Sequence, residues 1–450
     1  MKYKFLKVSF LILFAALVLD TLFFCSFLAI FCIIAFKKLP QDLCLKRIIG
    51  VTFILRLLVA VFLYDYAFLF NRVTFGEHGY VLPSWPYFSD ASYTLLRSLW
   101  IAKYHLGKIT NYLFLSELKN YGESLYNYII AFVFYLFGFQ PFHIVMMNLL
   151  FGCAMIIVMY QLALILFCKR VACYTVLFIS FMPSLFIISL MPLRDIAVSL
   201  NLVLFFFFIA KTLTEFRWRY VLYIPLSSFT LTLLRSRIPY SYLLLFFVFS
   251  VIAMWFFQKR RLPLLGGLLL IVFSINYFQP RLFQPLKEQA VTGLNELYHF
   301  HKAYVTVGTT YKILDNHRYH ESEKVLITAP LEHVRVFFRA WWHFLLQPFP
   351  RADGRVVSFI TSCEQLIWYL CLPLLAVGIF MSLHIYASRV LLCFIFILSS
   401  LLALSSGNVG TLVRHKTMIT PFLFMYVAIG LDYMVNLWSV RKVGVGVTRR

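Results

Sequence analysis

Two carboxylates, Asp90 and Asp195, are the side chains of this sequence best placed to do chemistry. Asp195 follows Arg194 after one long apolar stretch and opens the next. Asp90 lies in a hydrophilic segment, within Phe-Ser-Asp-Ala-Ser-Tyr at 88–93. Ionisable groups at the boundaries of membrane segments are energetically costly and are usually retained for function. Two acids on one face of a membrane predict acid–base catalysis, or the binding of a divalent metal ion, at that face.

A structural role is the alternative for both acids. Asp90 can cap a helix that carries Tyr93, and Asp195 can cap a helix or pair with Arg194. The two interpretations are compatible, because the N-terminus of a helix orients a carboxylate. The pattern requires no cofactor. The one cofactor that the two aspartates suggest is a divalent metal ion.

Basic side chains gather in short segments that we place on the same side as the two acids. Arg235 and Arg237 flank Ser236 between two apolar stretches, and a further basic group ends the segment 406–416. Short outer turns are normally poor in arginine, and a guanidinium group offers a two-pronged donor that matches phosphate. We predict that these side chains bind an anionic ligand, with contact to lipid head groups as the alternative: Arg194, Arg235, Arg237, Arg414, His415 and Lys416.

The hydrophilic segment 279–363 interleaves aromatic and basic residues. Trp341 and Trp342 fit a belt at the membrane interface or a platform on which a sugar stacks. With Tyr93, they are our candidates for contact with a sugar or an acceptor. His299 and His301 are a weak signal for zinc, because no acid is paired with them at helical spacing, and no metal-ligand set is predicted.

The composition is that of an integral membrane protein. Of 450 residues, 62% are hydrophobic and 13% are charged, and the mean hydropathy is +0.84, whereas soluble domains are about one quarter charged. The apolar residues come in runs of the length that a helix needs to cross a bilayer. We predict an all-α polytopic protein with these spans after an N-terminal one in 5–36: about 48–67, 143–167, 171–190, 196–213, 219–233, 238–257, 262–278, 364–386, 389–405 and 417–436.

The formal net charge of +23 does not indicate a nucleic-acid partner. The basic residues are spread over many loops, which is typical of the positive-inside rule and of contact with membrane lipids. Placing the basic short loops in the cytoplasm puts both long hydrophilic segments on the other side. The resulting divisions are an N-terminal anchor with a basic loop (1–47), a transmembrane module (48–278) with an outer loop at about 68–142, an outer loop (279–363), and C-terminal helices (364–450).

A helix is predicted between the first outer loop and the next span. Residues 125–138 are apolar but too short to span easily, and we expect them to lie at the interface. Gly138 is expected to end this helix, and Pro141 is expected to begin the following span.

The order of these features resembles one family of membrane enzymes. Leu-Arg-Leu (55–57) in a span is followed by Ser-Asp-Ala-Ser-Tyr in an outer loop, then by an aromatic helix ending in Phe-Gly. Met-Met-Asn-Leu-Leu (146–150) opens the next span, and Leu-Arg-Asp (193–195) lies at the outer face. Over about 48–215 the chain resembles the GT-C glycosyltransferases of bacterial inner membranes, in the group of the protein mannosyltransferases (family 39) and the lipid A aminoarabinose transferase.

The resemblance implies an enzyme of the bacterial inner membrane whose active site faces the periplasm. It implies a polyprenyl-phosphate sugar as donor and a glycan, lipid or protein as acceptor. Asp90 matches the family's catalytic base, and Asp195 matches a second acid of the site. Two departures leave the subfamily and the metal dependence open: Ala91 follows Asp90 where the family often has a second acid, and Glu123-Ser124 replaces the usual proline.

The expected reaction is attack of an acceptor hydroxyl on the anomeric carbon, with Asp90 taking its proton and cationic side chains stabilising the leaving phosphate. A single displacement inverts that carbon. Two alternatives remain at this stage. A polymerase or ligase of O-antigen type would use a diphosphate-linked donor, and a transporter would carry polar residues near the bilayer midplane, where the main charges are Arg56 and Asp20.

Overall fold

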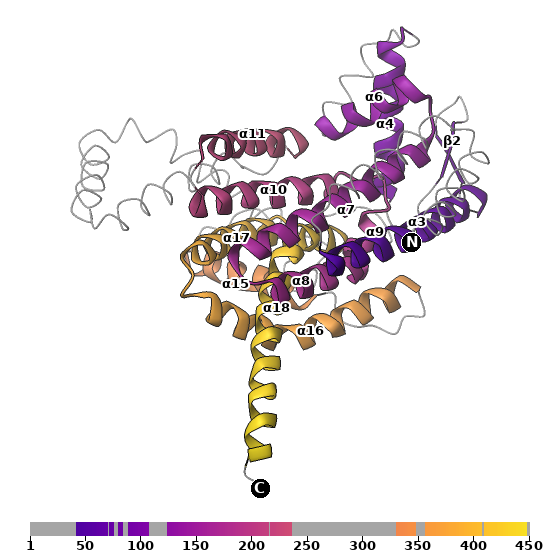
Figure 1. Cartoon of the computed structure of the whole chain (residues 1–450). Coiled ribbons are helices and arrows are strands. Elements are labelled where there is room, and N and C mark those ends of the chain that lie inside the picture. The colour runs from indigo at the N-terminus through magenta and orange to yellow at the C-terminus, as the bar shows by residue number, and fades with distance from the viewer. Residues whose placement is uncertain are drawn as a thin grey trace, which may run out of the picture. The chain divides into compact units, whose positions relative to one another are not determined.

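Figure 1 shows the computed structural model of the chain. The structure describes residues 42–70, 72–75, 80–83, 89–107, 124–215, 217–235, 330–347, 356–406 and 409–447. The predicted N-terminal span, the spans at 238–257 and 262–278, Arg237, His299 and His301 lie outside these residues.

The chain divides into two compact units, which we describe separately. Unit 1 comprises residues 1–161 and 172–200, and unit 2 comprises residues 162–171 and 201–450. Three helices cross a boundary between the units: α7 (Pro141–Leu166), α8 (Lys169–Phe181) and α10 (Asp195–Thr214).

Unit 1 contains most of the features that carried the resemblance. Its other helices are α3 (Leu43–Phe70), α4 (Ser89–His105), α6 (Leu125–Phe137) and α9 (Pro183–Ile188). Strands β1 (Arg72–Phe75) and β2 (Tyr80–Pro83) form an antiparallel hairpin in which Arg72 pairs with Pro83, and this hairpin contacts α3. Helices α4 and α6 pack on each other, as Figure 1 also shows.

One side of α3 faces the interior of unit 1. The buried positions recur every three or four residues, which is the period of one helix face, whereas most residues between them are partly or fully exposed, as expected beside lipid. The buried residues of α3 are Leu45, Ile49, Thr52, Arg56, Ala60 and Tyr64.

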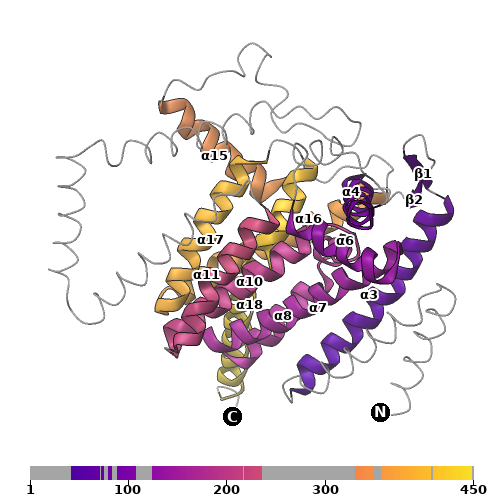
Figure 2. The same ribbon diagram turned by 90° about the horizontal axis from the view of Figure 1, so that it is seen from above.

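The described part of unit 2 contains the end of α7, the start of α8, most of α10, and five further helices. These are α11 (Trp218–Leu234), α15 (Pro330–Leu346), α16 (Val356–Ser382), α17 (Tyr386–Leu404) and α18 (Val409–Val447). Helices α16 and α18 make extensive contact and cross steeply in Figure 1. Figure 2 shows α15 beside one end of α17, on which it packs. A cluster of edge-to-face rings fills the core between α10, α17 and α18: Phe205, Phe206, Phe394 and Phe422.

The predicted all-α membrane class is confirmed. Six helices in the described parts are long and apolar enough to cross a membrane: Leu43–Tyr66, Pro141–Leu166, Asp195–Thr214, Ser362–Ser382, Tyr386–Leu404 and Gly410–Leu437. The predicted short helix before Pro141 is also present as α6, and Gly138 ends it with a φ of +80°. This left-handed conformation strains any residue with a Cβ, which explains glycine there.

The span predicted at 171–190 is wrong. Two helices replace it, because α8 ends at Phe181 and α9 begins at Pro183 after the extended residue Met182. Proline lacks the N–H that a continuing helix would need and clashes with the preceding turn, so it ends one helix and starts another.

The outer segment predicted at 406–416 is also wrong in its extent. Helix α18 begins at Val409, so Arg414, His415 and Lys416 lie on a helix instead of in a loop. Their polarity suggested a loop, but His415 is buried and its ring is hydrogen-bonded within unit 2. Tertiary partners therefore allow the helix to continue through polar residues.

Candidate functional site

Asp195 is buried at the start of α10. Its residue has no exposed surface, and the first hydrogen bonds of the helix run from Val198 N–H to the Arg194 carbonyl and from Ser199 Oγ to the Asp195 carbonyl, at 3.0 and 2.9 Å. The partial positive charge at a helix N-terminus favours a carboxylate there. The helix thus supplies the orientation that both sequence-based interpretations of Asp195 require.

The segment that leads to Asp195 is held by Asn148 of α7. The side-chain amide Nδ2 of Asn148 donates to the carbonyls of Met191 and Leu193, the latter at 3.0 Å. All three residues are fully buried. Because residues 189–194 are not helical, they lack the regular hydrogen bonds of a helix, and their buried carbonyls take other partners. Asn148 provides two of these partners and so fixes the approach of the chain to Asp195.

Tyr126 of α6 completes this network from the other side. Its hydroxyl donates to Oδ1 of Asn148 at 3.0 Å. Burial raises the pKa of the Tyr126 phenol well above its ordinary value of 10, and the negative charge of Asp195 acts in the same direction. The phenol therefore keeps its proton, and the amide of Asn148 is oriented with its oxygen toward Tyr126 and its nitrogen toward the two carbonyls.

Asp90 lies in the first turn of α4 and is half-buried. Its main-chain carbonyl accepts a hydrogen bond from Thr94 Oγ1 at 2.8 Å. Helix α4 packs on α6. Helix α6 carries Tyr126, whose pKa is raised in part by the charge of Asp195. Both candidate acids belong to unit 1. Helix α6 connects them, because it packs on the helix of Asp90 and carries the tyrosine of the Asp195 network. Tyr93, on α4 as well, is 47% exposed, so it is accessible to a ligand.

Arg235 and His415 are brought together in unit 2, although they are 180 residues apart. Arg235 is the half-buried C-cap of α11, and its Nη2 hydrogen-bonds to Nε2 of His415 on α18. A guanidinium can only donate, so Nε2 must be the unprotonated acceptor of the imidazole. The two predicted phosphate ligands thus form a hydrogen-bonded pair, in which the histidine fixes the orientation of the arginine.

The other ring nitrogen of His415 agrees with this tautomer. Nδ1 lies 2.7 Å from Ser406 Oγ and 3.2 Å from the Leu402 carbonyl. Ser406 Oγ donates its own proton to Leu402 O at 2.6 Å, so Nδ1 carries the hydrogen that both oxygens accept. His415 is therefore neutral and fully engaged.

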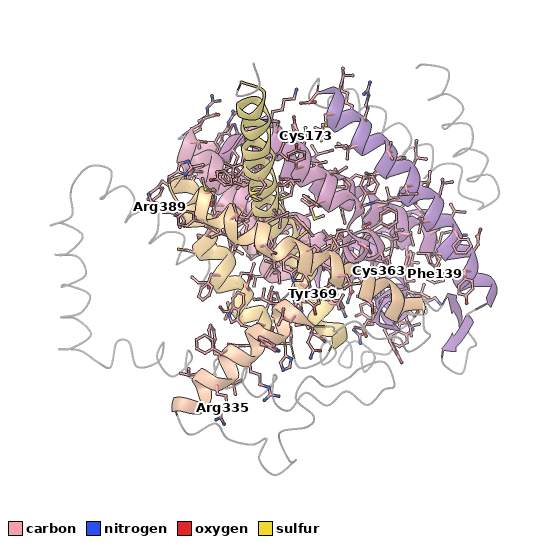
Figure 3. All side chains as sticks on the ribbon, turned by 90° about the horizontal axis from the view of Figure 1, so that it is seen from below. Phe139, Cys173, Arg335, Cys363, Tyr369 and Arg389 are labelled. Atoms are coloured by element: carbon pink, nitrogen blue, oxygen red, sulfur yellow. The ribbon has the colours of Figure 1, made fainter. Side chains whose placement is uncertain are left out.

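Lys416 occupies a different environment from the one predicted. Its Nζ donates to the carbonyls of Gln347 and Leu345 at 2.7 and 3.4 Å and lies 3.4 Å from Oε1 of Gln365. These carbonyls are at the C-terminal end of α15, where a cation is favourable. Tyr369 donates to the neighbouring Leu346 carbonyl, and Figure 3 shows Tyr369 at the end of α15 opposite Arg335. These contacts hold Lys416 at this helix end, and its assignment to the donor phosphate stays a prediction.

Two more predicted cations, Arg194 and Arg414, are half-buried. Arg194 immediately precedes Asp195, and the carbonyl of Arg414 accepts a hydrogen bond from Thr417 Oγ1 at 2.8 Å. Arg194 belongs to unit 1, whereas Arg414 belongs to unit 2 with Arg235. Their assignment to the donor phosphate stays a prediction.

Trp341 and Trp342 differ in exposure although they are adjacent on α15. Trp341 stacks on Phe396 of α17, with ring centroids 5.3 Å apart, and donates from Nε1 to Ser400 Oγ at 3.1 Å. Trp342 is 59% exposed. Trp341 therefore anchors α15 to α17, and Trp342 is the one of the pair that is available to a lipid or a sugar.

Among the residues that the structure describes, no three His, Cys, Asp or Glu side chains come together to hold a metal ion. A divalent ion at Asp90 and Asp195 stays a prediction. Sequence reasoning missed the parts of the site that carry no charge, namely Tyr126 and Asn148. The available signal was an asparagine within an apolar run, which is costly unless its amide is satisfied.

Comparison with known proteins supports the resemblance within the chain. Residues 124–278 match the family described as dolichyl-phosphate-mannose-protein mannosyltransferase. Over this segment the chain is similar to that family. The matched segment contains Tyr126, Asn148, Asp195 and Arg235, so it includes the Asp195 network, and it confirms the resemblance inferred from the sequence.

Two solved structures are similar to this chain over most of its length. They are crystal structures of ArnT from Cupriavidus metallidurans, one bound to undecaprenyl phosphate and one in the apo state. Their sequence identities to this chain are 11% and 13%, each covers 88% of this chain, and both have a TM-score of 0.45. The chain spans 63% and 62% of their lengths. No curated protein matches the chain in sequence.

Proposed function

We propose that this protein is a membrane glycosyltransferase that moves a sugar from a polyprenyl-phosphate donor to an envelope glycan, lipid or protein acceptor. The observation that carries the proposal is the buried Asp195 network within the segment that matches the mannosyltransferase family. The distribution of basic short loops supports a bacterial inner membrane with the site on the periplasmic side.

The proposed reaction is a single displacement. A hydroxyl oxygen of the acceptor attacks the anomeric carbon, the bond from that carbon to the phosphate oxygen breaks, and Asp90 takes the hydroxyl proton. The polyprenyl phosphate leaves with the bonding electron pair, and the anomeric configuration inverts. Asp195 helps to form the site, and its fixed position at a helix N-terminus suits a group that must not move during the reaction.

Arginine side chains are the proposed partners of the donor phosphate. Arg194, beside Asp195 in unit 1, and Arg235, held by the neutral His415 in unit 2, are separate candidates for this role. A guanidinium whose orientation is fixed before the ligand arrives stabilises developing negative charge without reorganisation. Trp342 and Tyr93 are exposed aromatic side chains that can contact the sugar or the acceptor.

The test replaces Asp90 by Asn and compares it with Asp65→Asn. Asp65 is an exposed acid in the same unit, so it is a matched control. Envelope glycans of a deletion strain, complemented with each variant at equal protein level, are analysed by mass spectrometry. Wild type and Asp65→Asn should restore one missing sugar, whereas Asp90→Asn should not. Full restoration by Asp90→Asn would refute the base assignment.

The same glycan analysis separates the competing functions. Loss of chain length with an intact repeat unit in the deletion strain would indicate a polymerase that uses a diphosphate-linked donor. An unchanged glycan profile in the deletion strain would contradict a transferase altogether.

A further inference from the structure

Arg56 is a fully buried cation near the middle of α3, a helix that can span the membrane. Its nitrogens Nε, Nη1 and Nη2 have no hydrogen-bond partner among the described residues. Its guanidinium lies over the ring of Phe186 of α9, with 5.3 Å from Cζ to the centroid. An aromatic face attracts a cation, but it does not satisfy the five N–H donors of an arginine.

Thr52 adds a second polar group on the same face of α3. It lies one helical turn before Arg56, it has no exposed surface, and its hydroxyl also lacks a hydrogen-bond partner in the described part of the chain. Residues four apart on a helix point in the same direction. Two side chains one turn apart on α3 thus point hydrogen-bond donors to the same side of the helix, and these donors have no partner among the described residues. The buried polar groups of a folded protein are normally paired.

Gly152 of α7 makes the room that Arg56 occupies. A Cβ at Gly152 would overlap Nη1 of Arg56 and the side chain of Ser189. Ser189 ends α9 and begins the segment that leads to Asp195. Gly152 also lies one turn after Asn148, which binds that same segment. The guanidinium therefore adjoins the chain that positions Asp195, one turn deeper along α7.

No contact of Arg56 with the described residues neutralises its charge. A guanidinium stays protonated in a protein, and an unpaired buried charge is unfavourable compared with an apolar side chain of similar size. A methionine would keep the contact with Phe186 and avoid that cost. Retention of the charge points to a negatively charged ligand.

We propose that Arg56 and Thr52 form a binding site for a phosphate group between α3, α7 and the segment 189–194. The charge and the two-pronged geometry of a guanidinium match phosphate oxygens, and the threonine hydroxyl supplies a further donor. The choice of phosphate among anions rests on the proposed function, which requires a lipid-linked phosphate. Because the guanidinium is enclosed, entry of the ligand requires one of the elements around it to move.

The test measures binding of two probes to the purified full-length protein in detergent: undecaprenyl phosphate by native mass spectrometry and inorganic phosphate by thermal stabilisation. Arg56→Met should weaken phosphate binding roughly 10- to 100-fold, as expected when a charged hydrogen bond is lost, and Thr52→Val should weaken it less. Binding of the lipid alone identifies a head-group site, and binding of both probes identifies a site for phosphate in general.

Arg389→Met is the matched control. Arg389 is exposed on α17 and lies over the Tyr386 ring at 5.2 Å, so this variant removes the same kind of cation–aromatic contact outside the proposed site. It should bind both probes like wild type. Equal binding by wild type and Arg56→Met would overturn the inference, and so would a wild type that binds neither probe.

Thermal stability without ligand distinguishes a binding role from a folding role. Arg56→Met should melt no lower than wild type, because it removes an unpaired buried charge; a clearly lower melting temperature would overturn the proposal. Asp20→Asn tests the chain's own acid as the partner of Arg56. If Asp20→Asn and Arg56→Met prove strongly coupled in a double-mutant cycle of stability, the arginine pairs with that acid and the proposal fails.

The transfer assay separates this inference from the proposed function. Sugar transfer by wild type, together with unchanged phosphate binding in Arg56→Met, would remove the Arg56 site and leave the glycosyltransferase standing. Absence of transfer, together with Arg56-dependent phosphate binding, would remove the glycosyltransferase assignment and leave the Arg56 site standing.

Discussion

The side-chain amide of Asn148 donates a hydrogen bond to the main-chain carbonyl of Leu193, with 3.0 Å between Nδ2 and the oxygen. This bond joins the first third of α7 to the last turn before Asp195, across 45 residues of sequence. The position of a carboxylate at the start of a buried helix depends on the position of the chain segment that precedes the helix. The Asn148–Leu193 bond is therefore the structural reason that Asp195 has a defined position.

Asn148→Asp should lower stability by about 2–4 kcal/mol and reduce transfer strongly, because it removes an amide donor to two buried carbonyls. It keeps the size of the side chain, so a loss cannot be assigned to a cavity. Stability is followed by thermal unfolding in detergent, and transfer by glycan analysis. The control is Asn436→Asp, because Asn436 on α18, in the other unit, donates to Asp432 of the same helix at 3.2 Å and lies outside the Asp195 network. Wild-type transfer by Asn148→Asp would contradict the role of this network.

Tyr126→Phe should cost about 1–3 kcal/mol at neutral pH, because Oδ1 of Asn148 loses its buried donor. It should also change the response to alkali. Burial raises the pKa of this phenol, so the folded protein keeps a proton that the unfolded chain releases above about pH 10. The stability from this group is therefore complete below pH ~10 and declines above it, by about 1.4 kcal/mol per pH unit. Denaturant titrations between pH ~9 and ~12 should show a shallower decline for Tyr126→Phe; equal slopes would contradict the assignment.

His415→Gln and His415→Phe should differ in activity. A glutamine can accept from Arg235 through its oxygen and donate to Ser406 through its nitrogen, whereas a phenylalanine can do neither. We expect His415→Phe to raise the apparent KM for the lipid-linked donor about 10-fold, because Arg235 loses its fixed orientation, and His415→Gln to restore most of the affinity. Steady-state kinetics with a defined donor measures this difference. Equal KM values in all three proteins would exclude His415 as the residue that positions Arg235.

Gly378→Ala and Gly430→Ala should each destabilise unit 2 by about 1–3 kcal/mol, because the added methyl group overpacks a helix contact. A Cβ at Gly378 would overlap the Tyr426 carbonyl, and a Cβ at Gly430 would overlap the Leu374 carbonyl. The two glycines thus allow α16 and α18 to approach each other closely, as small residues do in membrane helices. Gly50→Ala is the control, since a Cβ there meets no atom within 4 Å. Melting temperatures in detergent should fall only for the first two variants.

Much of the architecture followed from local patterns. Apolar runs of the length of a bilayer predicted the helices α3, α7, α10 and α17, because a chain in lipid must satisfy its own backbone. Gly138 ended the short helix before Pro141 as expected, since its conformation is a property of one residue. The family resemblance also depended on order along the chain, and the match to residues 124–278 supports it.

The sequence by itself determined the membrane class, most helix positions and the candidate acids, because hydropathy and local capping act over a few residues. Tertiary structure alone decided how polar side chains were used. It paired Arg235 with His415 across 180 residues, gave Lys416 the end of α15, and left Arg56 with no hydrogen-bond partner among the described residues. The physical reason is that a buried polar group is satisfied by whatever the fold places within about 3 Å of it, and residues distant in the chain supply that partner.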